Sequence, residues 1–440
     1  MEKDEKKDKK PKSNLLKRKQ KEKQEQIPES DVEVREVIVE KKTGFNTIEV
    51  VLIAILALAF GGVVGVVLAY TAKPLSIITN TDSPSDIQEV EKIYDNLLSK
   101  YYGEIDKQTL SDAAIKGMIE ALNDPYSTYI DAENTDDFDE QIYGYYVGIG
   151  TEITLNDENQ FEVTNIFENT PATDANIELH DIVVKVNNED VSGKTVSDIG
   201  KLIQGEIGTD VTLTLRRGEE EFDVTITRDR IDLISVTSQI FEKDDKRIGY
   251  IKVTNFASNT FNQFQTALNE LEENDIESLI IDVRDNLGGQ LEVATQIASL
   301  FLTKDKVVYQ LNTNGIIQPI YSTGPGSFQK PITVLINGAT ASASEVLAIA
   351  LQESADATVI GTTSYGKGTI QESYKLSTGA TIKFTVQEWL SPNGNTVNEV
   401  GVKPDIEVSE TENSGETDTL ETDTVLQTAI TIMQNNSSES

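Results

Sequence analysis

The alternation of polar and apolar stretches divides the chain into segments of different character. Residues 1–46 are rich in Lys, Glu and Gln, and we predict that they are disordered because they bury too little apolar surface to fold. Val50 to Tyr70 then contains no charged residue. With a rise of about 1.5 Å per residue, this run is long enough to cross a bilayer. It predicts a transmembrane helix over residues 47–71, which a polar linker over residues 72–86 follows.

A helical region is predicted over residues 87–140. Apolar residues recur at three-and-four spacing from Ile87 to Tyr101 and from Leu110 to Leu122, so each segment forms a helix with one apolar face.

The rest of the chain predicts two further domains and a tail. Residues 141–231 show short β runs, the first at Val147–Thr154, with one helix near Val196–Ile203, which indicates a compact β-rich domain. Strand and helix patterns alternate over residues 232–408, as in an α/β core. Residues 409–440 form an acidic tail with a short helix expected at Val425–Met433. The predicted fold class is therefore α+β and multidomain, with an N-terminal transmembrane helix, a helical segment, and a β-rich domain before an α/β core.

Basic residues flank the predicted membrane helix unequally. Lys41, Lys42 and the cluster from Lys17 to Lys23 precede it, whereas Lys73 alone follows closely. The positive-inside rule then predicts a single-pass cell-membrane protein with its N-terminus in the cytoplasm and its larger part outside. A cleaved signal peptide is the alternative, which the length of the run and its distance from the N-terminus disfavour.

Composition excludes several classes of function. The net charge is −36, so the chain would repel nucleic-acid phosphates, and we expect no nucleic-acid partner. The chain has no cysteine, which excludes disulfides and thiol nucleophiles. Its single histidine, His180, excludes metal sites with several histidine ligands, and a Ser–His–Asp triad would have to use it. His180 lies in the β-rich domain, where we interpret it as a turn residue.

One serine lies at a predicted strand-to-helix turn. Ser342 follows the strand Ile332–Ile336 and opens a helix, whose free N–H groups and dipole could stabilise an oxyanion. However, Ser342 and Glu345 also fit the S-x-x-E capping box. Taken alone, this segment favours the helix cap.

Two other turns could supply the remaining parts of a catalytic site. Gly288 and Gly289 follow the strand Ser278–Val283, and turns at the carboxyl ends of strands in one sheet can converge on a crevice. Lys367 lies between two glycines, and burial near Ser342 would lower its pKa and make it a base. The alternatives are an ordinary glycine turn and a solvated loop lysine. A phosphate-binding loop is excluded because the glycine spacing does not fit.

An ordered set of motifs resembles the carboxyl-terminal processing peptidases, also called tail-specific proteases. The resemblance covers residues 87–408, most of the predicted exported part. The motifs are Asn123-Asp124-Pro125-Tyr126-Ser127-Thr128-Tyr129, Gly148-Ile149-Gly150, Thr170-Pro171-Ala172, Gly205-Glu206-Ile207-Gly208-Thr209, Asp282-Val283-Arg284 with Asn286 and Gly288-Gly289, Ser342-Ala343-Ser344-Glu345, Tyr365-Gly366-Lys367-Gly368 with Gln371, Ser391-Pro392-Asn393-Gly394 and Gly401-Val402-Lys403-Pro404-Asp405-Ile406.

The resemblance implies roles for single residues. Ser342 corresponds to the nucleophile, Lys367 to the general base and Gln371 to the residue that orients the lysine. Gly289 and the N–H of Ala343 correspond to the oxyanion donors. The β-rich segment corresponds to a PDZ domain that binds a substrate's free C-terminus through Val147, Gly148, Ile149 and Gly150. The resemblance also implies a homodimer, and the chemistry requires no metal or cofactor.

The chain departs from the family pattern in the PDZ stretch and next to Ser342. Ala175-Asn176 and His180-Asp181 replace the usual Ala-Gly and Gly-Asp, Gln204 stands where an arginine is common, and Thr340 replaces the first serine of the usual Ser-Ala-Ser-Ala-Ser. Together, the predicted membrane helix and the resemblance predict a membrane-anchored serine endopeptidase that recognises C-terminal tails of proteins and cleaves with a Ser–Lys dyad. The alternative is a non-catalytic PDZ scaffold that captures such tails at the cell surface.

Overall fold

A computed structural model describes residues 85–409 and 422–436 of the protein. The predicted disordered segment, the predicted transmembrane helix and all but the last two residues of the predicted linker lie outside these ranges. Within them, no helix combines the length and the apolar character that a membrane crossing requires.

Both predicted N-terminal helices are confirmed, as α2 (Ser85–Lys100) and α3 (Lys107–Glu120). The α3 helix begins three residues before the predicted Leu110, because the Asp106 carboxylate accepts a hydrogen bond from the Thr109 N–H at 2.8 Å and caps it. Apolar side chains stay exposed on both helices: Ile93 on α2 is 53% exposed and Met118 on α3 is 57% exposed. The described chain therefore leaves apolar surface on these helices uncovered.

The β-rich domain contains a six-stranded antiparallel sheet in the order β3-β4-β5-β7-β8, with β6 paired to β5. The predicted helix α6 has the expected bounds, but the predicted run Val147–Thr154 forms two strands. The break lies at Gly150, whose φ is 87° and where a Cβ would come within 2.3 Å of Thr170 Cβ. The elements are β2 Tyr145–Gly148, β3 Thr151–Leu155, β4 Phe161–Ile166, α5 Pro171–Asp174, β5 Ile182–Val186, β6 Glu189–Asp190, α6 Val196–Ile203, β7 Asp210–Arg217, β8 Glu220–Thr227 and β9 Asp229–Asp232.

The α/β core contains a six-stranded sheet in the order β10-β11-β12-β15-β16-β19. All of its neighbouring strands are parallel except β10 and β11. The predicted alternation of strands and helices is confirmed. The central strands could be predicted because strands of a parallel sheet are buried on both faces and form continuous apolar runs. The elements are β10 Val236–Lys243, β11 Lys246–Val253, α7 Thr260–Glu273, β12 Ser278–Asp282, α8 Leu291–Phe301, β15 Ile332–Ile336, α9 Ala343–Ser354, β16 Thr358–Gly361, β19 Ile406–Glu407 and α10 Thr424–Asn436.

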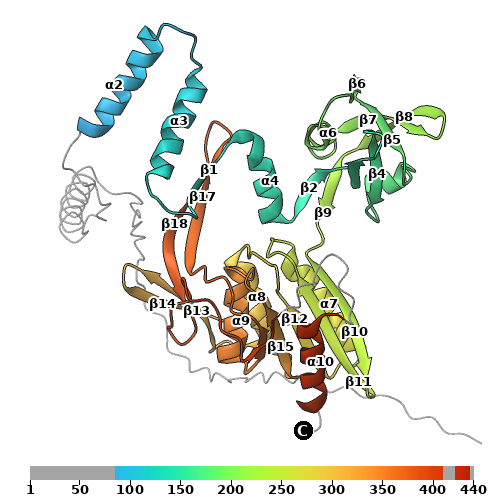
Figure 1. Ribbon diagram of the computed structural model, residues 1–440, viewed down its shortest axis with the longest axis vertical. Helices are drawn as coiled ribbons and strands as arrows, with labels where there is room; N and C mark the ends of the chain where they lie inside the picture. Colours follow the sequence, from blue (N-terminus) through green and yellow to red (C-terminus); the bar gives the residue numbers. More distant parts are fainter. Residues whose placement is uncertain (1–84, 410–421, 437–440) are drawn as a thin grey trace, which may run out of the picture. The chain divides into compact units, whose positions relative to one another are not determined.

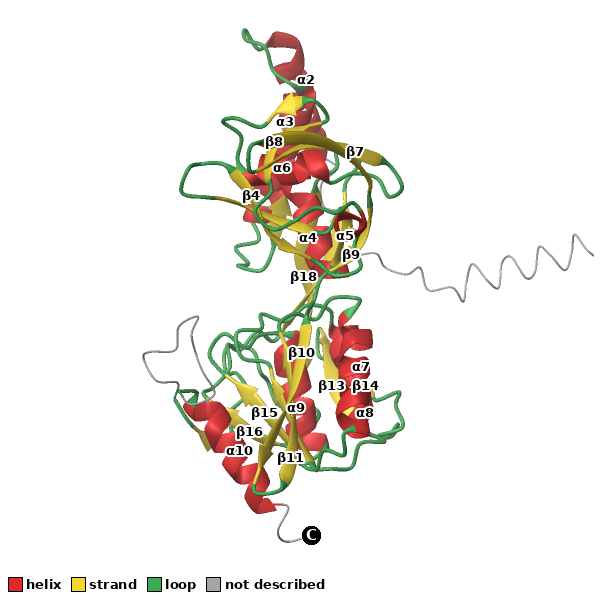
Figure 2. Ribbon diagram, turned by 90° about the vertical axis from the view of Figure 1, so that its right-hand side faces the viewer, coloured by secondary structure: helices red, strands yellow, loops and turns green. Residues whose placement is uncertain are grey.

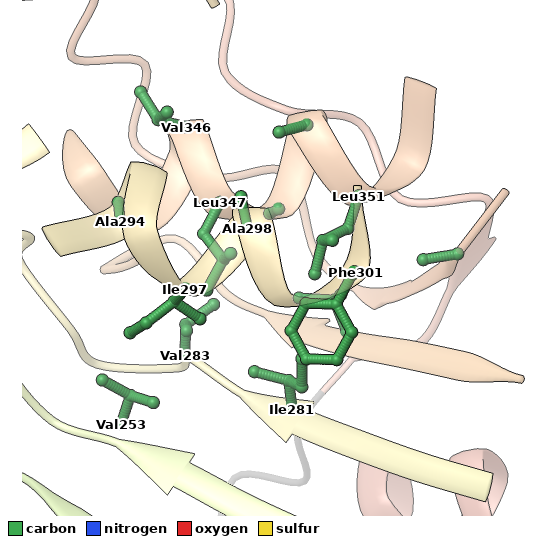
Figure 3. Close-up of a cluster of buried hydrophobic side chains, with 14 of the residues drawn as sticks. Val253, Ile281, Val283, Ala294, Ile297, Ala298, Phe301, Val346, Leu347 and Leu351 are labelled. Atoms are coloured by element: carbon green, nitrogen blue, oxygen red, sulfur yellow. The ribbon is translucent and has the colours of Figure 1, made fainter. Parts of the chain in front are cut away.

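Helices cover both faces of this sheet. The face formed by residues such as Ile251 and Ile281 packs against α7, α8 and α9, and Figure 3 shows Ile297 and Phe301 of α8 among these side chains. The opposite face packs against α10, the helix expected in the tail. Figure 2 shows α10 and α7 on opposite sides of the sheet. Arg284 fixes α10 by an ion pair to Asp423 at 2.7 Å.

A second, five-stranded sheet has the order β1-β18-β13-β14, with β17 paired to β18. Figure 1 shows β17 and β18 as a long antiparallel pair. This sheet is not predicted by the periodicity of the sequence, because polar and apolar residues are mixed along its strands. Its elements and the helix that follows β1 are β1 Thr128–Ile130, α4 Ala132–Tyr143, β13 Val307–Thr313, β14 Ile316–Tyr321, β17 Thr369–Lys375 and β18 Thr381–Leu390.

Candidate active site

Ser342 occupies a strained turn between β15 and α9. Its φ and ψ are 56° and −117°, in a region that residues with a Cβ rarely adopt. The residue is 9% exposed. Its backbone N–H donates a 2.7 Å hydrogen bond to the Glu345 carboxylate, as in the expected capping box. The surrounding structure therefore holds this serine in a conformation that an ordinary helix cap does not require.

The glycine turn after β12 lies directly against the serine turn, as the sequence analysis expected. A Cβ at Gly288 would lie 2.9 Å from Ser342 Cβ and 3.0 Å from the Ala343 nitrogen. The Asn286 carbonyl accepts hydrogen bonds from the Ala341 N–H at 3.0 Å and from the Ser344 hydroxyl at 2.9 Å. Only a glycine at position 288 leaves room for this contact.

Two backbone N–H groups at this junction fit the expected oxyanion donors. Ala343 is the first residue of α9, where N–H groups have no acceptor inside the helix. Gly289 follows Gly288, whose own N–H donates to Asn286 Oδ1 at 2.8 Å. Within residues 85–409 and 422–436, neither the Gly289 nor the Ala343 N–H has a hydrogen-bond acceptor. Both are therefore available to a substrate oxygen.

Lys367 is half-buried between its flanking glycines. Its Nζ lies 4.9 Å from the centre of the Tyr126 ring. Burial, followed by the positive charge of Lys383, lowers the pKa of Lys367, while the Glu345 and Asp124 carboxylates oppose that decrease. The amine is thus easier to deprotonate than an ordinary lysine. Among the hydrogen bonds of the described residues, none joins this amine to the Ser342 hydroxyl.

Glu345 joins the serine segment to the lysine segment. Its side chain is fully buried, with 0% exposure. Its Oε2 accepts the Ser342 N–H at 2.7 Å and the Lys367 N–H at 2.9 Å. Its Oε1 accepts the Gly366 N–H at 2.7 Å and the Ser364 hydroxyl at 2.5 Å. One carboxylate therefore fixes the backbone of both residues.

A cavity of about 780 Å³ brings the separate segments together. Ser342, Lys367, Gln371 and Gly289 all line it. The Gln371 amide nitrogen donates to the hydroxyls of two threonines, Thr369 at 2.9 Å and Thr385 at 3.2 Å. Gln371 therefore lies in the site, but in this structure its amide is engaged by the second sheet.

His180 lies elsewhere. It has a φ of 71° in the turn before β5, and its Nδ1 lies 2.5 Å from Glu162 Oε1. It does not line the cavity that contains Ser342. Its place in a turn agrees with the interpretation from the sequence.

The four residues predicted to bind a substrate tail lie at the start of the β-rich domain. Val147 and Gly148 end β2, Ile149 is buried, and Gly150 precedes β3. Ile149 and Gln204 are among the residues that line a second cavity of about 300 Å³. Residues of both β3 and α6 also line this cavity. The Gln204 amide donates to Glu140 Oε1 at 3.0 Å.

Several residues of the candidate site were not assigned to it from the sequence. It assigned Glu345 only to a helix cap, although an acid three residues after the serine was visible. Tyr126 was noted only as part of a motif. Burial, followed by a hydrogen bond with Tyr365, raises its pKa to about 12, so the ring beside Lys367 is uncharged. Lys383 gave no signal, because it lies in a strand that was not predicted.

Family models match three parts of the chain. A model of peptidase family S41 matches residues 247–408, a PDZ domain model matches residues 147–227, and a model of the activating protease CtpB N-terminal domain matches residues 71–134. The β-rich domain is therefore a PDZ domain that precedes an S41 peptidase core.

Individual proteins are also similar to this chain. The carboxy-terminal processing protease CtpA of Bacillus subtilis (strain 168) is 37% identical over 324 residues, which cover 73% of this chain and 69% of that protein. The carboxy-terminal processing protease CtpB of the same organism is 32% identical over 342 residues, which cover 77% and 71%. A solved photosystem II D1 C-terminal processing protease covers 72% of this chain and 86% of its own, with 27% identity and a TM-score of 0.42.

The identity to the two Bacillus subtilis proteases extends over more than two thirds of each chain and agrees with the order of the motifs. It confirms the resemblance found in the sequence: this protein belongs to the carboxy-terminal processing peptidases of family S41 and is a serine-type peptidase.

Proposed function

We propose that this protein is an endopeptidase that cleaves proteins near their C-termini, with Ser342 as the nucleophile and Lys367 as its general base. One observation carries the proposal: the strained serine and a half-buried lysine with a lowered pKa line the same cavity. A perturbed lysine beside a nucleophile in a cavity is the arrangement that a Ser–Lys dyad requires.

The chemistry follows from these positions. The neutral Lys367 amine takes the proton of the Ser342 hydroxyl as its oxygen attacks the scissile carbonyl carbon. The carbonyl oxygen becomes an oxyanion, to which the N–H groups of Gly289 and Ala343 donate. The lysine ammonium then returns the proton to the leaving amine, and an ester on Ser342 remains. Water hydrolyses this ester, again with Lys367 as the base.

The proton transfer requires a contact between the two side chains in the complex with substrate. Catalytic hydrogen bonds often form only when the substrate binds. In the proposed complex, the amide oxygen of Gln371 accepts an N–H of Lys367, which orients the amine and leaves its lone pair for the Ser342 proton. Glu345 holds the backbone on both sides of this contact and so limits the distance that must close.

The PDZ domain supplies the selection of tails in this proposal. A substrate's C-terminal strand adds to β3, and the backbone around Val147, Gly148, Ile149 and Gly150 binds its carboxylate. The apolar residues Ile149, Ile153 and Ile203 line the cavity there and favour an apolar tail.

Location and assembly are also part of the proposal. The uncharged run from Val50 to Tyr70 anchors the protein in the cell membrane, with the N-terminus in the cytoplasm and the peptidase outside. The protein forms a homodimer, in which a second copy covers apolar residues of α2 and α3 such as Ile93 and Met118.

The test uses the purified full-length chain and an unfolded protein with an apolar C-terminus. Wild type is expected to release fragments, whereas Ser342→Ala and Lys367→Ala are not, although both bind a peptide of the substrate's C-terminus as wild type does. Lys375→Ala is the matched control, because Lys375 is an exposed lysine at the end of β17, the strand that follows Lys367, and pairs with Asp139 at 3.1 Å. Cleavage by Ser342→Ala at the wild-type rate would refute the proposed nucleophile.

A further inference from the structure

A second lysine faces the catalytic cavity. Lys383 lies in β18, where it pairs with Ser373 of β17 and with Thr128 of β1. It lines the same cavity as Ser342 and Lys367. The positive charge of Lys383 is also the second largest cause of the lowered pKa of Lys367, so the two amines lie near each other. The reaction proposed above does not use this second amine.

Lys383 has no carboxylate partner in the described part of the chain. The contact found for its ammonium is with the Phe138 ring, whose centre lies 5.8 Å away. Burial lowers the pKa of Lys383, and no acidic group contributes in the opposite direction. By contrast, Lys375 of the adjacent strand forms an ion pair with Asp139 at 3.1 Å. In a chain of net charge −36, a half-buried amine in the cavity without a counter-ion is unusual.

A carboxylate that lines the cavity, that of Asp285, already accepts a hydrogen bond from another side chain. Asp285 lines the same cavity, but its Oδ1 accepts a hydrogen bond from the Asn337 amide at 2.8 Å. Asp124 contributes to the pKa of Lys367 but not to that of Lys383. The charge of Lys383 is therefore available to a group that enters the cavity from outside.

We propose that Lys383 forms a carboxylate-binding subsite, through which the enzyme prefers peptides that carry a carboxylate close to the scissile bond. The carboxylate belongs either to an Asp or Glu side chain or to the free C-terminus of the peptide. The inference rests on the proposed function, because it places this subsite in the cavity where Ser342 attacks. An ammonium–carboxylate hydrogen bond in a partly buried site is among the stronger polar contacts, and it fixes the register of the bound peptide.

Such a subsite has a second consequence. A carboxylate bound to Lys383 offsets its positive charge, so the pKa of Lys367 rises towards its ordinary value. Because catalysis requires neutral Lys367, acidic substrates need a higher pH for full turnover than neutral substrates of the same sequence. The affinity and the pH profile therefore report on the same contact independently.

The test begins with the bonds that the full-length enzyme cleaves in an unfolded protein, identified by mass spectrometry. Peptides around one such bond are made with Glu or Gln at each flanking position in turn. Wild type is expected to prefer Glu at one position by about 10-fold in kcat/KM, the size expected for a hydrogen bond to a charged group. Lys383→Met should abolish this preference and Lys383→Glu should reverse it, whereas the control Lys375→Met should retain it. The ratio for each peptide pair cancels any general effect of the variant on the rate.

Two further experiments distinguish the two sources of the carboxylate and separate a failure of the subsite from a failure of the proposed catalysis. Peptides that end near the scissile bond in an acid or an amide distinguish a free C-terminus from a side chain. Affinities measured in Ser342→Ala, with and without Lys383→Met, test the subsite without turnover, so a failure of the proposed catalysis does not affect this result. A Glu preference that persists in Lys383→Met, or equal affinity of Ser342→Ala for all paired peptides, overturns the subsite.

Discussion

The two sheets that contribute to the catalytic cavity differ in how they hold their functional residues. The strands β12 and β15 of the central sheet are buried along their full length, and the turns after them carry the glycines and Ser342. The strands β17 and β18 of the second sheet are mostly half-buried or exposed. Lys367 lies just before β17, Gln371 lies in β17 and Lys383 lies in β18.

The difference shows a division of tasks. Core packing fixes the proposed nucleophile and the proposed oxyanion donors, and a strained backbone at Ser342 persists only where the surroundings are rigid. Polar contacts fix the backbone of Lys367, the proposed base, and Glu345 joins the two parts by hydrogen bonds to both Ser342 and Lys367. Substitutions on the two sides should therefore differ in whether they change stability or the pH dependence of the rate.

Removal of the base should have the largest effect. We expect Lys367→Met to lower kcat/KM by about 1,000-fold, because a positioned general base typically contributes between about 100-fold and 10,000-fold. The substitution removes a buried charge and keeps most of the side-chain volume, so thermal unfolding should not shift downwards. Peptide cleavage assays and circular dichroism measure both quantities. A variant that retains most of the wild-type activity would contradict the role of Lys367.

A methyl group in the central-sheet turn should affect both activity and stability. In Gly288→Ala the new Cβ would lie 2.8 Å from the Ala341 carbonyl oxygen and 2.9 Å from Ser342 Cβ. We expect about a 100-fold loss of kcat/KM and a decrease of about 1–3 kcal/mol in the free energy of unfolding, the size of an overpacked core.

The control for this variant is Gly315→Ala. Gly315 also has a positive φ, of 86°, but a Cβ there would meet no atom within 4 Å. The control should show only the cost of the backbone conformation and keep full activity. Equal effects of both substitutions would mean that contact with the serine turn is unimportant.

Substitution of Glu345, which joins the two sides, should change the pH dependence of kcat/KM. In Glu345→Gln an amide replaces an acceptor of four hydrogen bonds, so kcat should fall about 10-fold or more, the loss expected when a buried donor loses its partner. The negative charge that favours the Lys367 ammonium disappears too, so the pKa of Lys367 falls further. The ascending limb of kcat/KM should therefore move to lower pH.

Glu353→Gln is the matched control for this substitution. Glu353 lies on the same helix and accepts the Asn393 N–H at 2.8 Å at an exposed site. It should leave the profile in place. A loss of activity in Glu345→Gln with an unmoved limb would indicate a structural role alone.

Lys383→Met should have the smallest effect on activity, and it should shift the pH profile in the direction opposite to Glu345→Gln. Without the positive charge of Lys383, the ammonium of Lys367 is less disfavoured, and its pKa rises. The ascending limb of kcat/KM for a neutral peptide should then move to higher pH, while the plateau at high pH stays within a few-fold of wild type. An unchanged limb would show that the two amines do not interact.

The contrast between the sheets also explains what the sequence could predict. Continuous apolar runs such as Ile332–Ile336 indicated the central strands, and the rule that turns at the carboxyl ends of neighbouring strands converge placed Gly288 near Ser342. The strands of the second sheet mix polar and apolar residues, and residues of two of them, β17 and β18, line the cavity. Periodicity therefore did not detect β17 or β18.

Residues that act through distant contacts were equally hidden. Lys383 lines the cavity and the Tyr126 ring lies beside the Lys367 amine, yet both come from parts of the chain far from Ser342. No local sequence pattern predicts such a contact. Glu345 was visible but had a sufficient local explanation as a helix cap. Its second pair of hydrogen bonds, to Gly366 and Ser364, depends on the tertiary fold.

The most direct test of the central claim is the pH dependence of the reaction of Ser342 with a serine-directed phosphonate, which isolates the attack from tail binding. In wild type the rate should rise with pH through a pKa below the ordinary lysine value of about 10.4. In Lys367→Met this titration should be absent and the rate low at every pH. An identical pH profile in both proteins would show that another group takes the proton from Ser342.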